Sequence, residues 1–193
     1  MLEGAVAGDE LAGAQRAVAK LFPTPQEMAS GGPELERWRT WDAAWPEFPF
    51  RSRSLNRLVV GETIISLAQT LIGHDEVRMY LALATAKYAD QPSEYNTLLH
   101  TDYPNHTLAV PRPEAGYHQM EAFIYLNDVG PANGATRFVS RRHTAHIPVG
   151  EHTLNYFDHT DLYEYPEDAS APAGSIVLYR PDVYHRSVDF ADP

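Results

Sequence analysis

The stretch LLHTDYPNH, residues 98–106, contains a histidine and an aspartate whose spacing is informative about the fold. Two leucines precede His100 and Asp102, which are two residues apart, and a proline turn follows. In a β-strand, residues two apart point to the same face of the sheet. The imidazole of His100 and the carboxylate of Asp102 are therefore predicted to face the same space, either as metal ligands or as a polar pair at a strand end.

A third candidate ligand lies in the stretch VLYRPDVYHRS, residues 177–187, where His185 stands in a second predicted strand. Two histidines and one carboxylate form the facial triad of non-heme Fe(II) oxygenases, which leaves other positions on the metal open. The open positions matter because the iron has to hold a co-substrate and O₂ together. The tripeptide H-x-D is common by chance in a chain with nine histidines, so the wider pattern has to decide.

The composition of the chain is that of a globular protein with one domain. Its 193 residues are enough for one compact core. The 26 acidic and 15 basic residues give a formal net charge of -11, which argues against nucleic acid or an anionic membrane as partner. Because there is no cysteine, disulfides, thiolate metal sites and cysteine nucleophiles are excluded. The sequence has neither a signal peptide pattern nor an apolar run of about 18 residues, so we expect a cytoplasmic location.

Hydrophobic periodicity divides the chain into a helical first part, about 1–74, and a β-rich second part, about 75–193. The first part is expected to contain helices at 10–22 and 61–73, with an irregular segment at 23–58 between them. The strands are expected at residues 77–88, 95–102, 116–129, 134–141, 174–180 and 183–190. Residues 146–172 form an acidic and aromatic insertion, which we expect to be a solvated lid loop. The expected fold is mainly β with flanking helices, a single domain built on a sandwich or barrel.

Three blocks follow one another in order: LLHTD at 98–102, YLNDVGPANGATRFVSRRH at 125–143 and AGSIVLYRPDVYHRS at 173–187. In this order they resemble the phytanoyl-CoA dioxygenase family of 2-oxoglutarate-dependent oxygenases, over about residues 75–190. The resemblance implies a double-stranded β-helix core, a jelly roll of the cupin kind. It also implies a dioxygenase that uses Fe(II), 2-oxoglutarate and O₂ to hydroxylate or otherwise oxidise a C–H bond of a small molecule, with release of succinate and CO₂.

The resemblance assigns roles to individual residues. His100, Asp102 and His185 would bind Fe(II) and form the catalytic centre. An aspartate at the second of these positions implies hydroxylation or a related oxidation, because halogenating relatives have a small residue there.

The 2-oxoglutarate site is implied by the same resemblance. Ser187, Phe123 and Gln119 match positions that line or hold the co-substrate. Tyr103 and Asn105, directly after the H-x-D tripeptide, are expected to touch substrate at the mouth of the pocket.

One feature of the family is missing. The arginine that binds the distal carboxylate of 2-oxoglutarate lies in the family on the strand after the distal histidine, and this sequence ends at Pro193 before that strand. Arg186 points to the opposite face from His185. We expect that the chain is truncated, that Arg137 or Arg180 substitutes, or that 2-oxoglutarate is not used. A non-oxidative cupin-type metal enzyme and an inert β-sandwich binding protein therefore stay open as alternatives, as does the oligomeric state.

Overall fold

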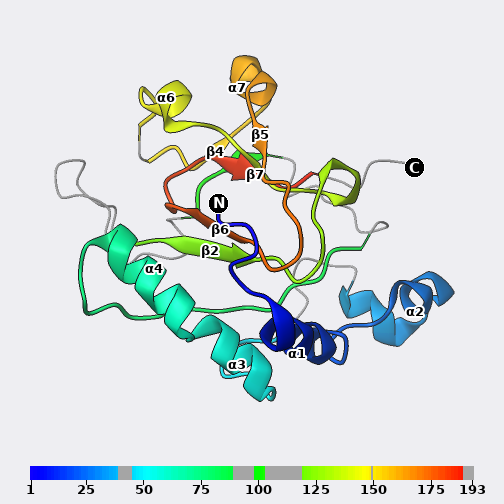
Figure 1. The fold of residues 1–193 in the computed structure, drawn as a ribbon. Helices are drawn as coiled ribbons and strands as arrows, with labels where there is room; N and C mark the ends of the chain where they lie inside the picture. Colours follow the sequence, from blue (N-terminus) through cyan, green and yellow to red (C-terminus); the bar gives the residue numbers. More distant parts are fainter. Residues whose placement is uncertain (39–44, 89–97, 103–118, 149, 189–193) are drawn as a thin grey trace.

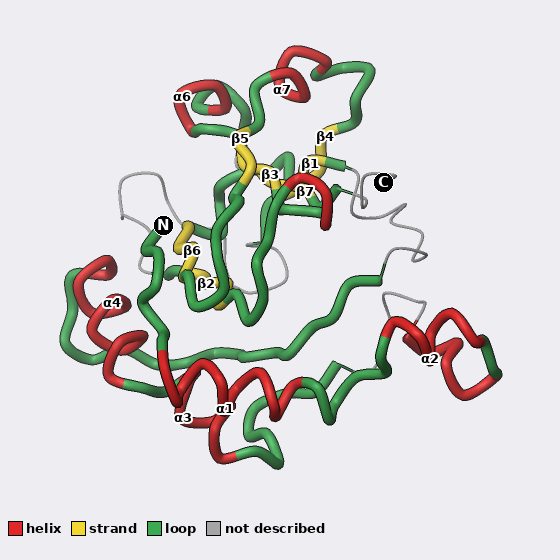
Figure 2. Tube along the Cα trace, turned by 45° about the vertical axis from the view of Figure 1, so that its right-hand side comes forward, coloured by secondary structure: helices red, strands yellow, loops and turns green. Residues whose placement is uncertain are grey.

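The computed structural model of the chain describes residues 1–38, 45–88, 98–102, 119–148 and 150–188. Two antiparallel sheets lie one above the other, and helices lie outside both of them (Figures 1 and 2). The larger sheet has the strand order β4-β1-β7-β3-β5, and the smaller sheet pairs β2 with β6. The strands are β1 (Leu99–His100), β2 (Glu121–Ile124), β3 (Arg137–Phe138), β4 (Thr153–Leu154), β5 (Glu167–Asp168), β6 (Ile176–Tyr179) and β7 (His185–Arg186). The expected β-rich class with flanking helices is confirmed, and two facing sheets are consistent with a jelly roll.

The helices gather mainly in the first third of the chain. They are α1 (Gly8–Val18), α2 (Pro25–Ser30), α3 (Arg53–Val59), α4 (Glu62–Ile72), α6 (Arg141–Thr144) and α7 (Thr160–Glu164), with 3₁₀ turns η1 (Pro33–Trp38) and η3 (Pro131–Asn133). Both expected helices are confirmed, as α1 and α4. The expectation of an irregular segment at 23–58 was wrong, because α2, η1 and α3 lie there. α2 and α3 have only six and seven residues, too short for periodicity to show, and side-chain caps at Thr24 and Ser52 begin them.

The smaller sheet has one apolar face and one face that carries functional groups. Ile124 and Ile176 pack with residues of α1 and α3 in one hydrophobic cluster, and Figure 1 shows these helices on the side of β2 and β6 away from the larger sheet. Because side chains alternate along a strand, Glu121, Phe123 and Tyr179 point to the other face. The helices thus hold the smaller sheet so that these three side chains face the larger one.

The larger sheet alternates in the same way. Its outer face packs in a second hydrophobic cluster, which consists of Leu99, Val139, Leu154, Leu162 and Tyr184. Their strand neighbours His100, Phe138 and His185 point inward, towards the smaller sheet.

The segment 146–172 supplies part of that outer cluster, since Leu154 and Leu162 are fully buried against Leu99. The segment also contributes β4 and β5 to the sheet and carries α7. The expectation of a solvated lid loop was therefore wrong for this part of the chain. The acidic composition of the segment suggested exposure to solvent, but Leu154 and Leu162 within it are buried.

Residues 77–88 do not form a strand, contrary to expectation. They are extended, and Leu83 makes a single bridge with Glu47, beside a hydrogen bond from the backbone N–H of Ala84 to the carbonyl of Pro46. The other expected strands each contain a described strand that is shorter than expected. Strand length depends on how much of a neighbouring chain runs alongside, which the period of the sequence does not reveal.

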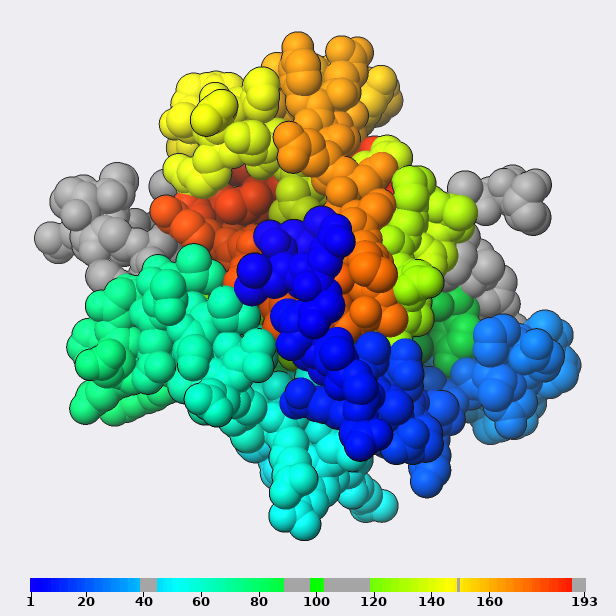
Figure 3. Space-filling model, viewed as in Figure 1, coloured from blue at the N-terminus to red at the C-terminus, as the bar shows by residue number. Residues whose placement is uncertain are grey.

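The N-terminal segment completes the smaller sheet at its free edge. Leu2 forms a bridge with Ile176, and both of their backbone hydrogen bonds are 2.9 Å long. Figure 3 shows this segment, in blue, lying across the orange and red residues that include β6. Within the described residues, no helix has the length and apolar character required to cross a membrane.

Candidate metal centre

His100, Asp102 and His185 converge between the two sheets. His100 on β1 is directly opposite His185 on β7, so the two side chains share a face of the sheet, and their ring centroids are 4.5 Å apart. Asp102 follows β1, and its backbone N–H donates to the carbonyl of Pro181 at 2.9 Å. Each residue offers one ligand atom, and these atoms lie within 4.8 Å of one another. The spacing of two and the pairing of β1 with β7 together create the cluster.

Both imidazole rings are oriented by backbone carbonyls. The Nδ1 atom of His100 lies 3.0 Å from the carbonyl oxygen of Leu98, and that of His185 lies 3.0 Å from the carbonyl oxygen of Val183. When Nδ1 donates its proton to a carbonyl, Nε2 keeps a lone pair for a metal. The Nε2 atoms lie 3.9 Å (His100) and 3.2 Å (His185) from the nearer carboxylate oxygen of Asp102. Two imidazole nitrogens and one carboxylate fit Fe(II), and they also suit nickel or zinc.

Burial and neighbouring charges set the protonation of the cluster. Burial opposes ionisation of Asp102, but the hydrogen bond and charge of His185, together with hydrogen bonds from Glu121 and Tyr179, outweigh burial, so the pKa of Asp102 lies below its ordinary value. Burial, followed by the proximity of His185, lowers the pKa of His100. An ionised carboxylate beside a neutral imidazole is the state in which both can bind a divalent metal.

Two residues that the sequence analysis missed surround Asp102. The hydroxyl of Tyr179 lies 2.9 Å from Oδ2 of Asp102 and 2.8 Å from Oε2 of Glu121. Burial, followed by the negative charge of Asp102, raises the pKa of Glu121 to about 8. Burial and the two carboxyl groups also raise the pKa of Tyr179 well above its ordinary value. The available signal was an acidic residue in the apolar strand segment EAFI, in alternation with Phe123.

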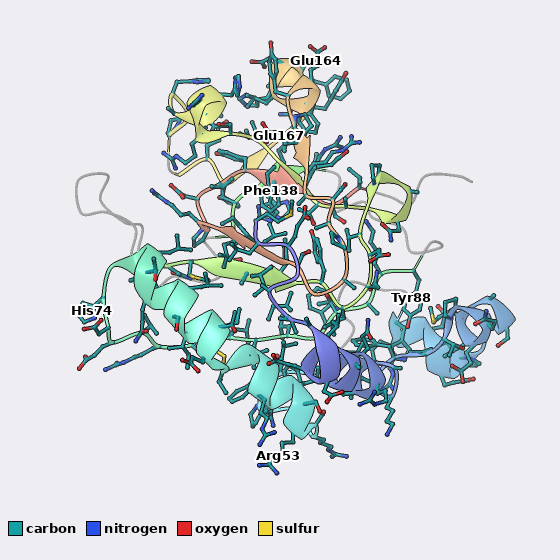
Figure 4. The ribbon with its side chains drawn as sticks, in the orientation of Figure 1. Arg53, His74, Tyr88, Phe138, Glu164 and Glu167 are labelled. Carbon is teal, nitrogen blue, oxygen red and sulfur yellow. The ribbon has the colours of Figure 1, made fainter. Side chains whose placement is uncertain are left out.

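Aromatic rings form one wall beside the cluster. Phe138, opposite His185 in register, stacks on its imidazole at 5.4 Å, and Tyr179 meets the same imidazole edge-on at 5.1 Å. Phe123 lies 5.2 Å from the ring of Tyr179, and Figure 4 shows Phe138 between the two sheets. A cavity of about 350 Å³ opens beside Phe138 and Tyr179. Apolar rings on one side of the centre lower the local dielectric, which strengthens electrostatic interactions there.

A lysine that the sequence analysis also missed lies beyond His185. The ammonium of Lys87 donates to the hydroxyl of Ser187 at 2.7 Å and contacts the carbonyl oxygen of Val188. Gly134 makes room for it: a Cβ at Gly134 would lie 2.5 Å from Nζ of Lys87, and the φ of Gly134 is +77°. The Asn-Gly block therefore has a local purpose, since glycine adopts this conformation without strain and leaves space for the lysine.

The remaining predicted site residues have different surroundings. Phe123 lies in the aromatic wall, whereas Gln119 is half-buried two residues before β2. Tyr103 and Asn105 lie outside the described residues.

The two arginines proposed as substitutes are bound to aspartates. Arg137 is 2.6 Å from Asp168, and its neighbour Phe138, not Arg137 itself, shares the face of His185. Arg180 donates to both carboxylate oxygens of Asp182, at 3.0 and 2.9 Å. Each charge is already matched by a carboxylate, which makes both arginines poor substitutes for the missing one.

Comparison with known proteins agrees with this geometry. HygX from Streptomyces hygroscopicus, whose crystal structure has nickel and 2-oxoglutarate bound, has a similar fold with a TM-score of 0.60 and 15% sequence identity. The match covers 100% of this chain and 77% of HygX. No curated protein matches the chain significantly. The sequence profile of the phytanoyl-CoA dioxygenase (PhyH) family matches residues 2–189, and the chain therefore belongs to this family.

Proposed function

We propose that the chain is an Fe(II)- and 2-oxoglutarate-dependent dioxygenase that hydroxylates or otherwise oxidises a C–H bond of a small molecule. The observation that carries the proposal is the convergence of His100, Asp102 and His185 in a chain of this family. A similar fold that holds nickel and 2-oxoglutarate in HygX supports it. A single oxygenase domain and a cytoplasmic location are parts of the same proposal.

His100, Asp102 and His185 would hold Fe(II) through two Nε2 atoms and a carboxylate oxygen. Bound iron with 2-oxoglutarate and O₂ supplies the oxidation of a C–H bond, with release of succinate and CO₂. Within the part of the chain that the structure describes, three side chains form the cluster, and a metal held by three ligands keeps other positions free for small molecules. The aspartate keeps its ligand position occupied, which favours hydroxylation over halogenation.

Ser187 and Lys87 would bind the distal carboxylate of 2-oxoglutarate. A hydrogen bond of 2.7 Å already joins the Lys87 ammonium to the Ser187 hydroxyl. Ser187 is two residues after His185 in the chain. An ammonium attracts a carboxylate, and a hydroxyl adds a second donor. Lys87 would thus take the role of the family's arginine.

Phe123 would close the co-substrate pocket with its ring, in line with its contacts to Tyr179 and Phe138. Gln119, which strand alternation places on the same face as Phe123, would add a polar contact to 2-oxoglutarate. Tyr103 and Asn105 would touch substrate at the pocket mouth, which stays a proposal from the sequence.

An anaerobic titration with Fe(II) and 2-oxoglutarate tests the function. The wild type should develop a weak visible charge-transfer band, which His100→Ala should abolish. His143→Ala is the matched control, since His143 is exposed and stacks on Tyr165 at 4.7 Å, away from the cluster. If the wild type binds Fe(II) but shows no charge-transfer band, the result favours the non-oxidative metal enzyme. If it binds neither Fe(II) nor 2-oxoglutarate, the result favours the inert binding protein.

Exposure to O₂ extends the test to the reaction. Succinate should accumulate with the wild type and not with Asp102→Ala. Full succinate formation by Asp102→Ala would remove Asp102 from the proposed centre. Mass spectrometry of a metabolite pool incubated with the loaded enzyme should then show a substrate that gains one oxygen.

A further inference from the structure

We propose that Tyr179 and Glu121 are positioning residues that hold the carboxylate of Asp102 in the orientation required for metal binding. This inference rests on the proposed metal centre and adds two residues to it. It starts from the hydroxyl of Tyr179, which lies within hydrogen-bond distance of both Asp102 and Glu121.

Strand register places the pair. Glu121 on β2 is directly opposite Tyr179 on β6, so both side chains leave the smaller sheet on the face towards Asp102. The centre is therefore assembled from both sheets: β1 and β7 of the larger sheet contribute the histidines, and β2 and β6 contribute the support of the carboxylate.

The ring of Tyr179 has little freedom to move. Its centroid lies 5.0 Å from that of Phe138, 5.1 Å from that of His185 and 5.2 Å from that of Phe123. A phenol packed on three sides presents its hydroxyl at a fixed point. Asp102, by contrast, stands beyond the end of β1, where the strand does not restrain its side chain.

Glu121 restrains the hydroxyl in turn. One oxygen, Oε2, lies 2.8 Å from the hydroxyl, while Oε1 is buried and has no hydrogen-bond partner among the described residues. A buried polar group without a hydrogen-bond partner lowers the stability of the folded state. An acidic side chain at position 121 is therefore unfavourable for folding. Its contact with the hydroxyl that supports Asp102 gives a functional reason for its presence.

Packing alone would need no hydroxyl. Phenylalanine would fill the same place between Phe123 and Phe138 without bringing oxygen atoms among apolar rings. Both groups described within hydrogen-bond distance of the Tyr179 hydroxyl are carboxyl groups, so the hydroxyl can donate to Asp102 and accept from Glu121 when Glu121 carries its proton. Partners of metal ligands orient them, and their loss commonly costs 10–100-fold in metal affinity.

Titration with Co(II), followed by visible absorption, tests the inference. Tyr179→Phe should weaken Co(II) binding by about 10–100-fold and change the ligand-field spectrum. Tyr125→Phe is the matched control, because its hydroxyl donates to the carbonyl of Ala169 at 2.9 Å and it lies on the chain just after β2. Equal affinity and spectrum in Tyr179→Phe and wild type would overturn the inference, and so would an equal loss in Tyr125→Phe.

Two variants of Glu121 keep the inference testable if Tyr179→Phe fails to fold. Glu121→Gln retains a side chain whose amide N–H can donate to the hydroxyl oxygen, and it should bind Co(II) much as the wild type does. Glu121→Leu removes the hydrogen-bonding group at similar size and should lose affinity as Tyr179→Phe does. Equal affinity in the Gln and Leu variants would overturn the role of Glu121. A wild type that binds no Co(II) would overturn the metal centre itself, which separates the two failures.

Discussion

Lys87 brings a positive charge to Ser187 and Val188, just beyond His185. Arg137 and Arg180 have carboxylate partners of their own. A hydrogen bond from an ammonium to a carboxylate is stronger than one to a neutral acceptor. A lysine is a compact charge without the planar fork of arginine, so it would bind one carboxylate oxygen at a time.

Lys87→Met should weaken 2-oxoglutarate binding by about 10–100-fold, because a hydrogen bond to a charged group contributes about 1.5–3 kcal/mol. Binding is measured through the charge-transfer band under anaerobic conditions, at saturating Fe(II). Lys87→Arg should retain more affinity than Lys87→Met, since the charge is kept. Lys20→Met, at an exposed position, is the control. Unchanged affinity in Lys87→Met would contradict the role of this lysine.

The sequence suggested that His100, Asp102 and His185 converge, and the structure brings them together. The sequence did not suggest the residues that surround them. His100 and Asp102 are two apart, a spacing that predicts a shared face in a strand, although Asp102 lies just beyond β1. Lys87, Glu121 and Tyr179 reach the site through pairings that bring distant segments together, such as the contact of Lys87 with Ser187. Spacing along one strand carries no information about such contacts.

At the scale of elements, the segment 146–172 shows how a surface composition can conceal a structural role. Its acidic and aromatic side chains include Phe157, which is 90% exposed, yet Leu162 is 1% exposed and Leu154 is fully buried. These leucines cover the outer face of β1, opposite to the face that carries His100. The segment therefore supports the strand behind the metal centre.

Leu162→Ala should lower the free energy of unfolding by about 2–5 kcal/mol, the usual cost of truncating a buried leucine. Phe157→Ala should change it by less than about 0.5 kcal/mol, because an exposed side chain loses few contacts. Urea denaturation monitored by circular dichroism measures both. Equal effects of the two substitutions would show that the segment is not anchored through Leu162.

For the whole molecule, the metal centre joins parts of the chain that are distant in sequence. His100 and His185 are neighbours across β1 and β7, and unfolding separates them. A ligand that binds only the folded state stabilises it by mass action. At a hundred times its dissociation constant, a metal adds about 2.7 kcal/mol of stability.

Ni(II) at that concentration should raise the melting temperature of the wild type by roughly 5–10 °C, as expected for a chain of this size. His185→Ala should lose the increase, because one of the three ligands is gone. Differential scanning fluorimetry with and without a chelator measures the shift. An increase of the same size in His185→Ala would place the nickel elsewhere on the protein.

The fold class was easier to predict from the sequence than the bounds of the individual helices and strands. The helix patterns at 10–22 and 61–73 are long enough to show a period, and both helices are present as α1 and α4. For residues 77–88 the period allowed a helix or a strand, and their position before a run of strands favoured a strand. Within the described residues, their one bridge joins Leu83 to Glu47. Pairing is a property of the assembled molecule, and local composition cannot report it.

The bridge between Leu2 and Ile176 has a practical consequence for anyone who prepares this protein. Leu2 pairs with Ile176 through a single bridge at the edge of β6, and Val6 is buried in the cluster beneath the smaller sheet. Deleting residues 1–6 would uncover the backbone of β6, and an uncovered strand edge invites self-association. The same strand ends at Tyr179, so damage at its edge would reach the support of Asp102. A purification tag at this terminus needs a flexible spacer, and trimming designs should leave these first residues intact.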